Sequence, residues 1–134
     1  MRFLLQIIRK LPLTTFFSIA IWIVCMVPIP ETPLSDVNMI DKWTHLVMFA
    51  LLSLIVWWEL LGCHDVKDKW KILLAATLYP AATGCLIELA QAHLTGGTRS
   101  GEWLDAAADM LGVLAALPIG ILLAVWFARK RKAQ

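Results

Sequence analysis

Two acidic side chains stand at the start of the longest apolar segment of the chain. Asp105 and Asp109 lie four positions apart, and residues 110–128, which follow them, include no charged side chain. A carboxyl group at the centre of a membrane helix costs about 2.5 to 3.5 kcal/mol on insertion scales, so it normally faces protein, water or a partner charge. These two carboxyl groups are therefore the first candidates for a functional site.

Other polar side chains stand at the ends of the preceding apolar segments. Asp41 and His45 are four positions apart, so they share one face of a helix. Glu88 and Gln91 are three positions apart and also share a face. His93 lies five positions from Glu88 and points elsewhere, which favours an interfacial position over a direct role.

Carboxyl groups in unlike surroundings can serve as acid and base. At 1.5 Å per residue, Asp109 lies about 6 Å deeper along a helix than Asp105. We therefore expect a protonated Asp109 beside an ionised Glu88 or Asp105. His45 is an alternative proton carrier. These four residues are the catalytic candidates.

Cationic and amide side chains near the same helix ends indicate a binding role. Lys42 and Arg99 can hold a phosphate group by charge and hydrogen bonding. Gln91 and Asp41 complete the set of candidates for contact with a substrate. The expected substrate is a lipid-linked sugar or phosphate whose head group lies at the membrane surface.

Three other interpretations stay open. His45, Asp41, Glu88 and Asp105 could coordinate a divalent ion, but no tight ligand motif is present, so we assign no metal and name no cofactor. The polar cluster could instead bind a lipid head group or drug without catalysis. It could also be structural, with His45 paired to an acid and Arg99 paired to Glu88 or Asp105.

The composition predicts a small integral membrane protein. Of 134 residues, 60% are hydrophobic and 16% are charged, which is too little polar surface for an ordinary soluble domain. Four apolar segments each approach the roughly 20 residues that a helix needs to cross hydrocarbon. We expect one all-α domain over residues 1–134, a four-helix bundle without a nucleic-acid partner. The predicted helices cover about residues 11–29, 43–61, 72–92 and 103–128.

The distribution of cations predicts the orientation of the bundle. With a cytoplasmic N-terminus, ten Lys and Arg residues lie inside and two, Lys42 and Arg99, lie outside. Positive charge is retained on the cytoplasmic side, so both termini are expected there and the polar cluster is expected beneath the outer surface. The ten inner cations are Arg2, Arg9, Lys10, Lys67, Lys69, Lys71, Arg129, Lys130, Arg131 and Lys132.

The spacing of the polar residues resembles that of the VanZ-like family of bacterial integral membrane proteins. The resemblance covers the last three helices, and the family usually carries Asn where this chain has Asp109. The matching positions are Asp41-Lys42-x-x-His45-x-x-x-Phe49, Glu88-x-x-Gln91, and Arg99 followed six positions on by Asp105 and seven further by Gly112.

The resemblance implies a multi-pass protein of the bacterial inner (cytoplasmic) membrane with a cell-envelope role at the outer leaflet. It suggests resistance to teicoplanin as the phenotype. The expected partners are a membrane lipid, a lipid-linked glycan head group or a lipoglycopeptide, bound and processed in the polar pocket. The alternative is a non-catalytic membrane scaffold or lipid-binding protein whose polar cluster is structural.

Overall fold

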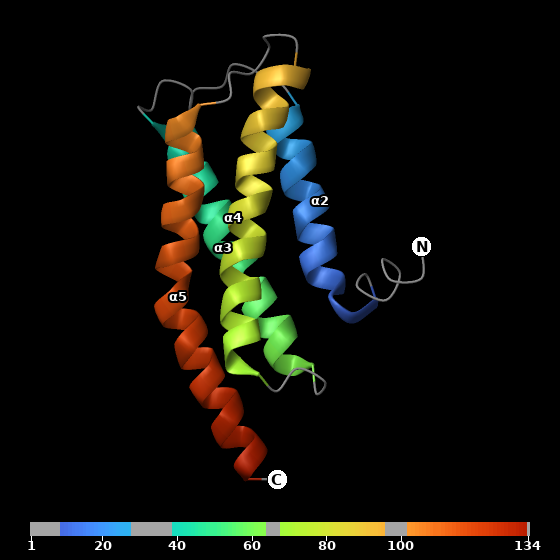
Figure 1. The fold of residues 1–134 in the computed structure, drawn as a ribbon, viewed down its shortest axis with the longest axis vertical. Coiled ribbons are helices and arrows are strands. Elements are labelled where there is room, and N and C mark those ends of the chain that lie inside the picture. The colour runs from blue at the N-terminus through green and yellow to red at the C-terminus, as the bar shows by residue number, and fades with distance from the viewer. Residues whose placement is uncertain (1–8, 28–38, 64–67, 96–101, 134) are drawn as a thin grey trace.

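The computed structural model describes residues 9–27, 39–63, 68–95 and 102–133, and four helices account for most of them. No strand occurs among the described residues, so the prediction of an all-α chain with four helices is confirmed. The helices run alternately up and down (Figure 1). They are α2 (Pro12–Met26), α3 (Ile40–Gly62), α4 (Lys69–Leu94) and α5 (Trp103–Lys132).

Three of the helices are long and apolar enough to cross a membrane, which indicates a membrane protein. These are α3, α4 and α5, with 23, 26 and 30 residues. Helix α2 is apolar but has only 15 residues, so it falls short of the length that a helix needs to span hydrocarbon. The expected first segment ran to residue 29, and its last two residues lie outside the described part of the chain.

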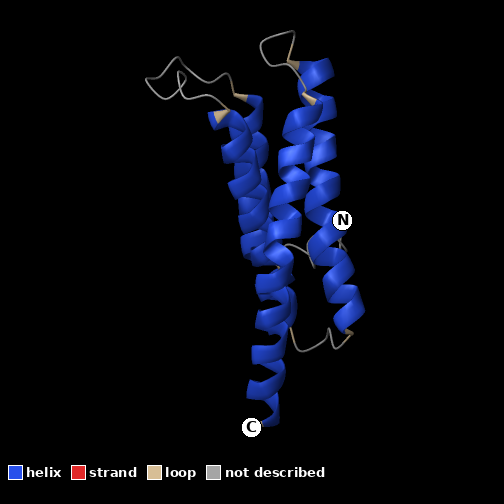
Figure 2. Ribbon diagram, turned by 90° about the vertical axis from the view of Figure 1, so that its left-hand side faces the viewer, coloured by secondary structure: helices blue, strands red, loops and turns tan. Residues whose placement is uncertain are grey.

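The helices meet at two chemically different ends. The first turn of α2 lies against the last turn of α3. There the Glu59 carboxylate accepts hydrogen bonds from the backbone N–H groups of Leu13 and Thr14, each at 2.8 Å. Arg131 in the last turn of α5 donates to the Leu61 carbonyl oxygen. We call this the basic end, and the opposite end, where α3 and α5 begin and α4 finishes, the polar end (Figures 1 and 2).

Close packing of α3 on α5 fixes the positions of the polar residues. A Cβ at Gly112 would overlap the Leu46 carbonyl oxygen and would lie 3.0 Å from the Ala50 backbone nitrogen, so only glycine permits this approach. Phe49, Leu52 and Val113 pack beneath it with no exposed surface. A well-packed core therefore supports the polar end from below.

Candidate functional site at the polar end

Three helices bring ionisable side chains together at the polar end. Helix α3 contributes His45 (2% exposed), α4 contributes Glu88 (8%), and α5 contributes Asp105 (3%) and Asp109 (2%). Their ring and carboxylate groups are therefore nearly shielded from the surroundings by the protein itself. Burial strengthens the electrostatic interactions among them and makes unpaired polar atoms costly.

The centre of the site is a buried contact between α3 and α5. His45 Nδ1 lies 2.9 Å from Asp109 Oδ1 and 3.9 Å from Glu88 Oε1. The imidazole also stacks on Phe49 one turn below, with ring centroids 6.4 Å apart and an interplanar angle of 11°. Together these contacts fix the ring, with its Nδ1 atom directed at the two carboxyl groups.

Gly84 on α4 makes room for Asp109. A Cβ at this position would lie 2.5 Å from Asp109 Oδ2, so any side chain here would push the carboxyl group away. Among the described residues, Asp109 Oδ2 has no hydrogen-bond partner, and neither has Glu88 Oε1. The centre of the site thus contains two buried carboxylate oxygens whose hydrogen-bonding capacity is not used.

Lys42 closes the site above this centre. Its Nζ atom lies 2.6 Å from Glu102 Oε2 and 3.0 Å from Asp105 Oδ1, so one ammonium group is shared by two carboxylates. The backbone N–H of Glu102 donates to Glu88 Oε2 at 2.9 Å. The entry to α5 is thereby joined to both α3 and α4.

Gln91, predicted to contact substrate, reaches a backbone group instead. Its Nε2 donates to the Cys25 carbonyl oxygen near the end of α2 at 2.9 Å, and the side chain is 3% exposed. This contact ties α4 to α2. Its Oε1 atom has no hydrogen-bond partner among the residues that the structure describes.

The remaining predicted positions lie at the periphery of the site or outside the description. Asp41 is half-buried. One of its carboxylate oxygens, a ring nitrogen of His45 and a carboxylate oxygen of Asp105 lie within 4.8 Å of one another. His93 is exposed near the end of α4. Arg99 lies outside the described residues.

Acidic groups outnumber basic groups in the described part of the site. One lysine and one histidine, Lys42 and His45, face five carboxyl groups. Such a site favours cations and protons, and within this part of the chain an anionic group is attracted only at Lys42, whose side chain is partly exposed. The five acids are Asp41, Glu88, Glu102, Asp105 and Asp109.

A small apolar groove opens beside Lys42 between α3 and α5. It has a volume of about 250 Å³. Its walls are aliphatic and aromatic apart from the lysine, so the groove suits a hydrocarbon chain whose polar end is close to Lys42. The lining residues are Met39, Lys42, Trp43, Leu46, Leu104, Ala107, Ala108 and Leu111.

The sequence interpretation treated Gly84 as a packing residue and did not include Glu102 among the site candidates. Gly84 carried no sign of a role because a glycine in a membrane helix is most often a packing residue. Glu102 precedes α5, and only the fold reveals that it meets Lys42 and Glu88. Comparison with protein-family models, with curated proteins and with solved structures finds no match for this chain.

Proposed function

We propose that this protein binds the head group of a lipid-linked glycan, a phospholipid or a lipoglycopeptide in the polar site, at the outer leaflet of the bacterial cytoplasmic membrane. The observation that carries the proposal is the buried His45–Asp109 contact, which lies close to an apolar groove with Lys42 in its wall. Hydrocarbon would occupy the groove. The head group would then lie beside Lys42, above the buried carboxyl groups.

The orientation follows from charge. Four cations of the last turn of α5, Arg129 to Lys132, lie at the basic end. Positive side chains are retained on the cytoplasmic side, so the basic end is cytoplasmic in this proposal and the polar end faces outward. Lys69 and Lys71, in the first turn of α4, lie at the same end of the bundle and support the same orientation.

The site also has the groups for proton transfer. When Nδ1–H of His45 donates to Asp109, Nε2 is the ring nitrogen that accepts a proton from a hydroxyl group or a water molecule. A buried carboxylate stabilises the imidazolium that results. The site could therefore process the head group by general acid–base chemistry, with Glu88 and Asp105 as further acids.

The polar positions resemble those of the VanZ-like family, and teicoplanin resistance is the phenotype that the resemblance suggests. Expression of the full chain in a teicoplanin-sensitive bacterium tests this directly. We expect a rise in the minimal inhibitory concentration that is lost in His45→Gln and kept in His93→Gln. His93 is exposed near the end of α4, so its variant controls for the loss of any histidine.

Lipid binding is tested by native mass spectrometry of the purified protein. We expect one copurified lipid class, retained by Asp105→Asn and His93→Gln and lost in the double variant Lys42→Gln/Asp105→Asn, which removes the charge of the groove together with the buried carboxylate beside it. A copurified lipid whose amount is unchanged in the double variant would contradict the proposed position of the head group. Unaltered turnover of that lipid in His45→Gln would contradict the catalytic role.

A purely structural polar end is the second candidate function. The contacts of Gln91 with Cys25 and of Glu102 with Glu88 favour it, because each joins two helices. It predicts that His45→Gln and Lys42→Gln fail to accumulate in the membrane and that the folded fraction keeps its lipid content. Normal accumulation of both variants would exclude it.

A further inference from the structure

We propose that His45, Glu88 and Asp109 bind one divalent transition-metal ion of the Zn²⁺ type. One ligand atom from each side chain lies within 4.8 Å of the others, and all three side chains are buried. One imidazole nitrogen with two carboxylate oxygens is a donor set that suits Zn²⁺, with a further position left for water or substrate. Each of the helices α3, α4 and α5 supplies one ligand.

The buried oxygens without partners point to a ligand. Within the described ranges of the chain, Glu88 Oε1 and Asp109 Oδ2 have no hydrogen-bond partner, although the two side chains are only 8% and 2% exposed. A buried acceptor without a donor costs about 1 to 3 kcal/mol, so an arrangement of this kind persists where something else satisfies it. A metal ion lying between these carboxyl groups and His45 would do so.

The charge of the three groups leads to the same conclusion. Two ionised carboxylates and a neutral imidazole carry two negative charges, and a divalent cation neutralises them. Without it, like charges a few ångströms apart in a medium of low dielectric constant repel strongly. The His45–Asp109 hydrogen bond and the metal-bound arrangement are then two states of the same side chains, because a bound metal ion displaces the proton between them.

The supporting residues hold the ligands in place. Glu88 Oε2 accepts from the Glu102 backbone N–H at 2.9 Å, which directs the other oxygen inward. Phe49 stacks on the His45 ring. Contacts of this kind orient metal ligands and account for much of a site's affinity.

A second group, Asp41 with His45 and Asp105, meets the same distance limit but is less suited to a metal ion. Lys42 Nζ lies 3.0 Å from Asp105 Oδ1 and already neutralises it. Asp41 is only half-buried. The two groups share His45, so the choice between them is decided by Asp41→Asn, which removes a ligand from the second group alone.

The test uses the full chain in detergent, purified with a tag that lacks histidine, stripped with EDTA and exposed to Zn²⁺ alone. After gel filtration we expect one zinc per chain by elemental analysis and a higher midpoint of thermal unfolding. Glu88→Gln and Asp109→Asn should each weaken Zn²⁺ binding at least tenfold. Asp41→Asn and His93→Gln should bind like the parent chain.

The unfolding midpoint without metal shows whether each variant is folded. Less than 0.2 zinc per chain for the folded parent, or equal binding by folded Glu88→Gln and Asp109→Asn, would overturn the metal site. Loss of binding in Asp41→Asn would overturn the choice of ligands. Because no lipid is added, a metal site that survives this test stands even if the proposed head-group binding fails.

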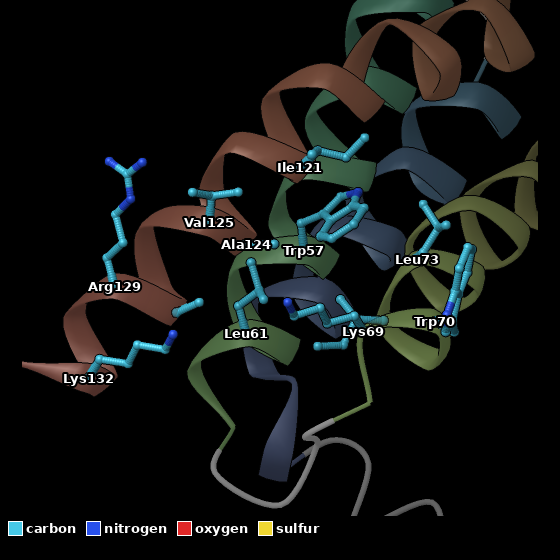
Figure 3. Close-up of a pocket in the computed structure, with 12 residues that line it drawn as sticks. Trp57, Leu61, Lys69, Trp70, Leu73, Ile121, Ala124, Val125, Arg129 and Lys132 are labelled. Carbon is cyan, nitrogen blue, oxygen red and sulfur yellow. The ribbon is translucent and has the colours of Figure 1, made fainter.

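Independently of the metal site, we infer that a groove at the basic end binds an acyl chain of an anionic phospholipid. The groove lies between α3, α4 and α5, has a volume of about 490 Å³, and is walled by apolar side chains such as Trp57, Leu61 and Val125 (Figure 3). Trp57 lies against Gly120, and its indole N–H has no hydrogen-bond partner in the part of the chain that the structure describes.

Cations surround the mouth of this groove. Lys69 comes from α4, and Arg129 and Lys132 come from α5. In Figure 3 the side chains of Lys69 and Lys132 point toward one another across the mouth. Within the described part of the chain, none of the three cations forms an ion pair. The apolar walls suit an acyl chain, and the cations at the mouth suit the anionic head group of the same lipid. A second copy of this basic surface would be repelled.

Native mass spectrometry with phosphatidylglycerol and phosphatidylcholine at equal concentration tests the inference. We expect at least fivefold preference for phosphatidylglycerol, lost in the double variant Lys69→Gln/Lys132→Gln. The control Lys71→Gln/Lys130→Gln removes the same charge from the same two helices outside the groove and should keep the preference. No preference in the parent chain, equal loss in both variants, or a dimer in place of bound lipid would overturn it.

Discussion

His45 Nδ1 and Asp109 Oδ1 lie 2.9 Å apart, although the two residues are 64 positions apart in the sequence and each is 2% exposed. The contact joins α3 to α5 about one turn above Gly112, where the backbones of the two helices lie close together. It therefore fixes the rotation of the two helices about their axes as well as the orientation of the imidazole.

Asp109→Asn should preserve this geometry. The amide oxygen still accepts from His45 Nδ1–H and the side chain keeps its size, so we expect a change in stability of less than about 1 kcal/mol. Asp109→Leu removes the acceptor and leaves a buried imidazole N–H unsatisfied, which costs about 1 to 3 kcal/mol. Thermal unfolding in detergent distinguishes the two variants, and equal midpoints would contradict the structural importance of the contact.

Lys42→Met should destabilise the polar end strongly. It leaves Asp105, which is 3% exposed, without its cation, and uncompensated buried charge costs about 3 to 5 kcal/mol. Adding Asp105→Asn should recover most of this loss, because the buried charge then disappears. A double-mutant cycle of unfolding midpoints measures the coupling, and strictly additive effects would show that the two groups do not interact.

Gly112→Ala should separate α3 from α5. The new methyl group would overlap the Leu46 carbonyl oxygen, and backbone atoms cannot move aside cheaply, so we expect a loss of about 1 to 3 kcal/mol. Gly62→Ala is the matched control, since no described atom lies within 4 Å of its new Cβ. The difference in unfolding midpoint between the two variants is the measurement, and its absence would contradict the close helix contact.

Glu59→Ala should loosen α2. The carboxylate satisfies two backbone N–H groups, of Leu13 and Thr14, that the first turn of a helix cannot satisfy itself. Caps of this kind contribute about 0.5 to 2 kcal/mol. Glu59→Gln keeps an acceptor and should lose less. Hydrogen exchange at the start of α2 reports the effect, and unchanged protection in Glu59→Ala would show that the cap is unimportant.

The helices could be predicted from hydropathy because four long apolar segments admit few other structures in a membrane. Helical spacing also placed Asp41 beside His45 and Glu88 beside Gln91 on common faces. Helices α3, α4 and α5 extend further than the apolar segments predicted for them. Helix α3 begins at Ile40, so that Asp41 and Lys42 belong to its first turn. Polar residues can extend a helix beyond its apolar segment because its backbone hydrogen bonds are already formed. Hydropathy therefore does not locate the ends of the helix.

The partners within the site could not be predicted to the same degree. Spacing within one helix defines a face, but the pairing of His45 with Asp109 depends on the rotation and depth of two helices. Gln91 donates to a backbone carbonyl, and every residue has one, so its sequence context gives no sign of the partner. In the sequence Glu59 is one polar residue near a helix end. Its role as a cap becomes evident only in the structure, where the first turn of α2 lies beside it.

Helix α5 has 30 residues and is therefore about 45 Å long, against a hydrocarbon thickness of about 30 Å. Figure 2 shows its C-terminal turns reaching beyond the other helices. The long basic side chains of these turns can still reach the phosphate layer when a change in bilayer thickness shifts that layer along the helix axis. We therefore expect a thinner or thicker bilayer to be accommodated at this end, with the immersion depth of His45 unchanged when lipid composition changes.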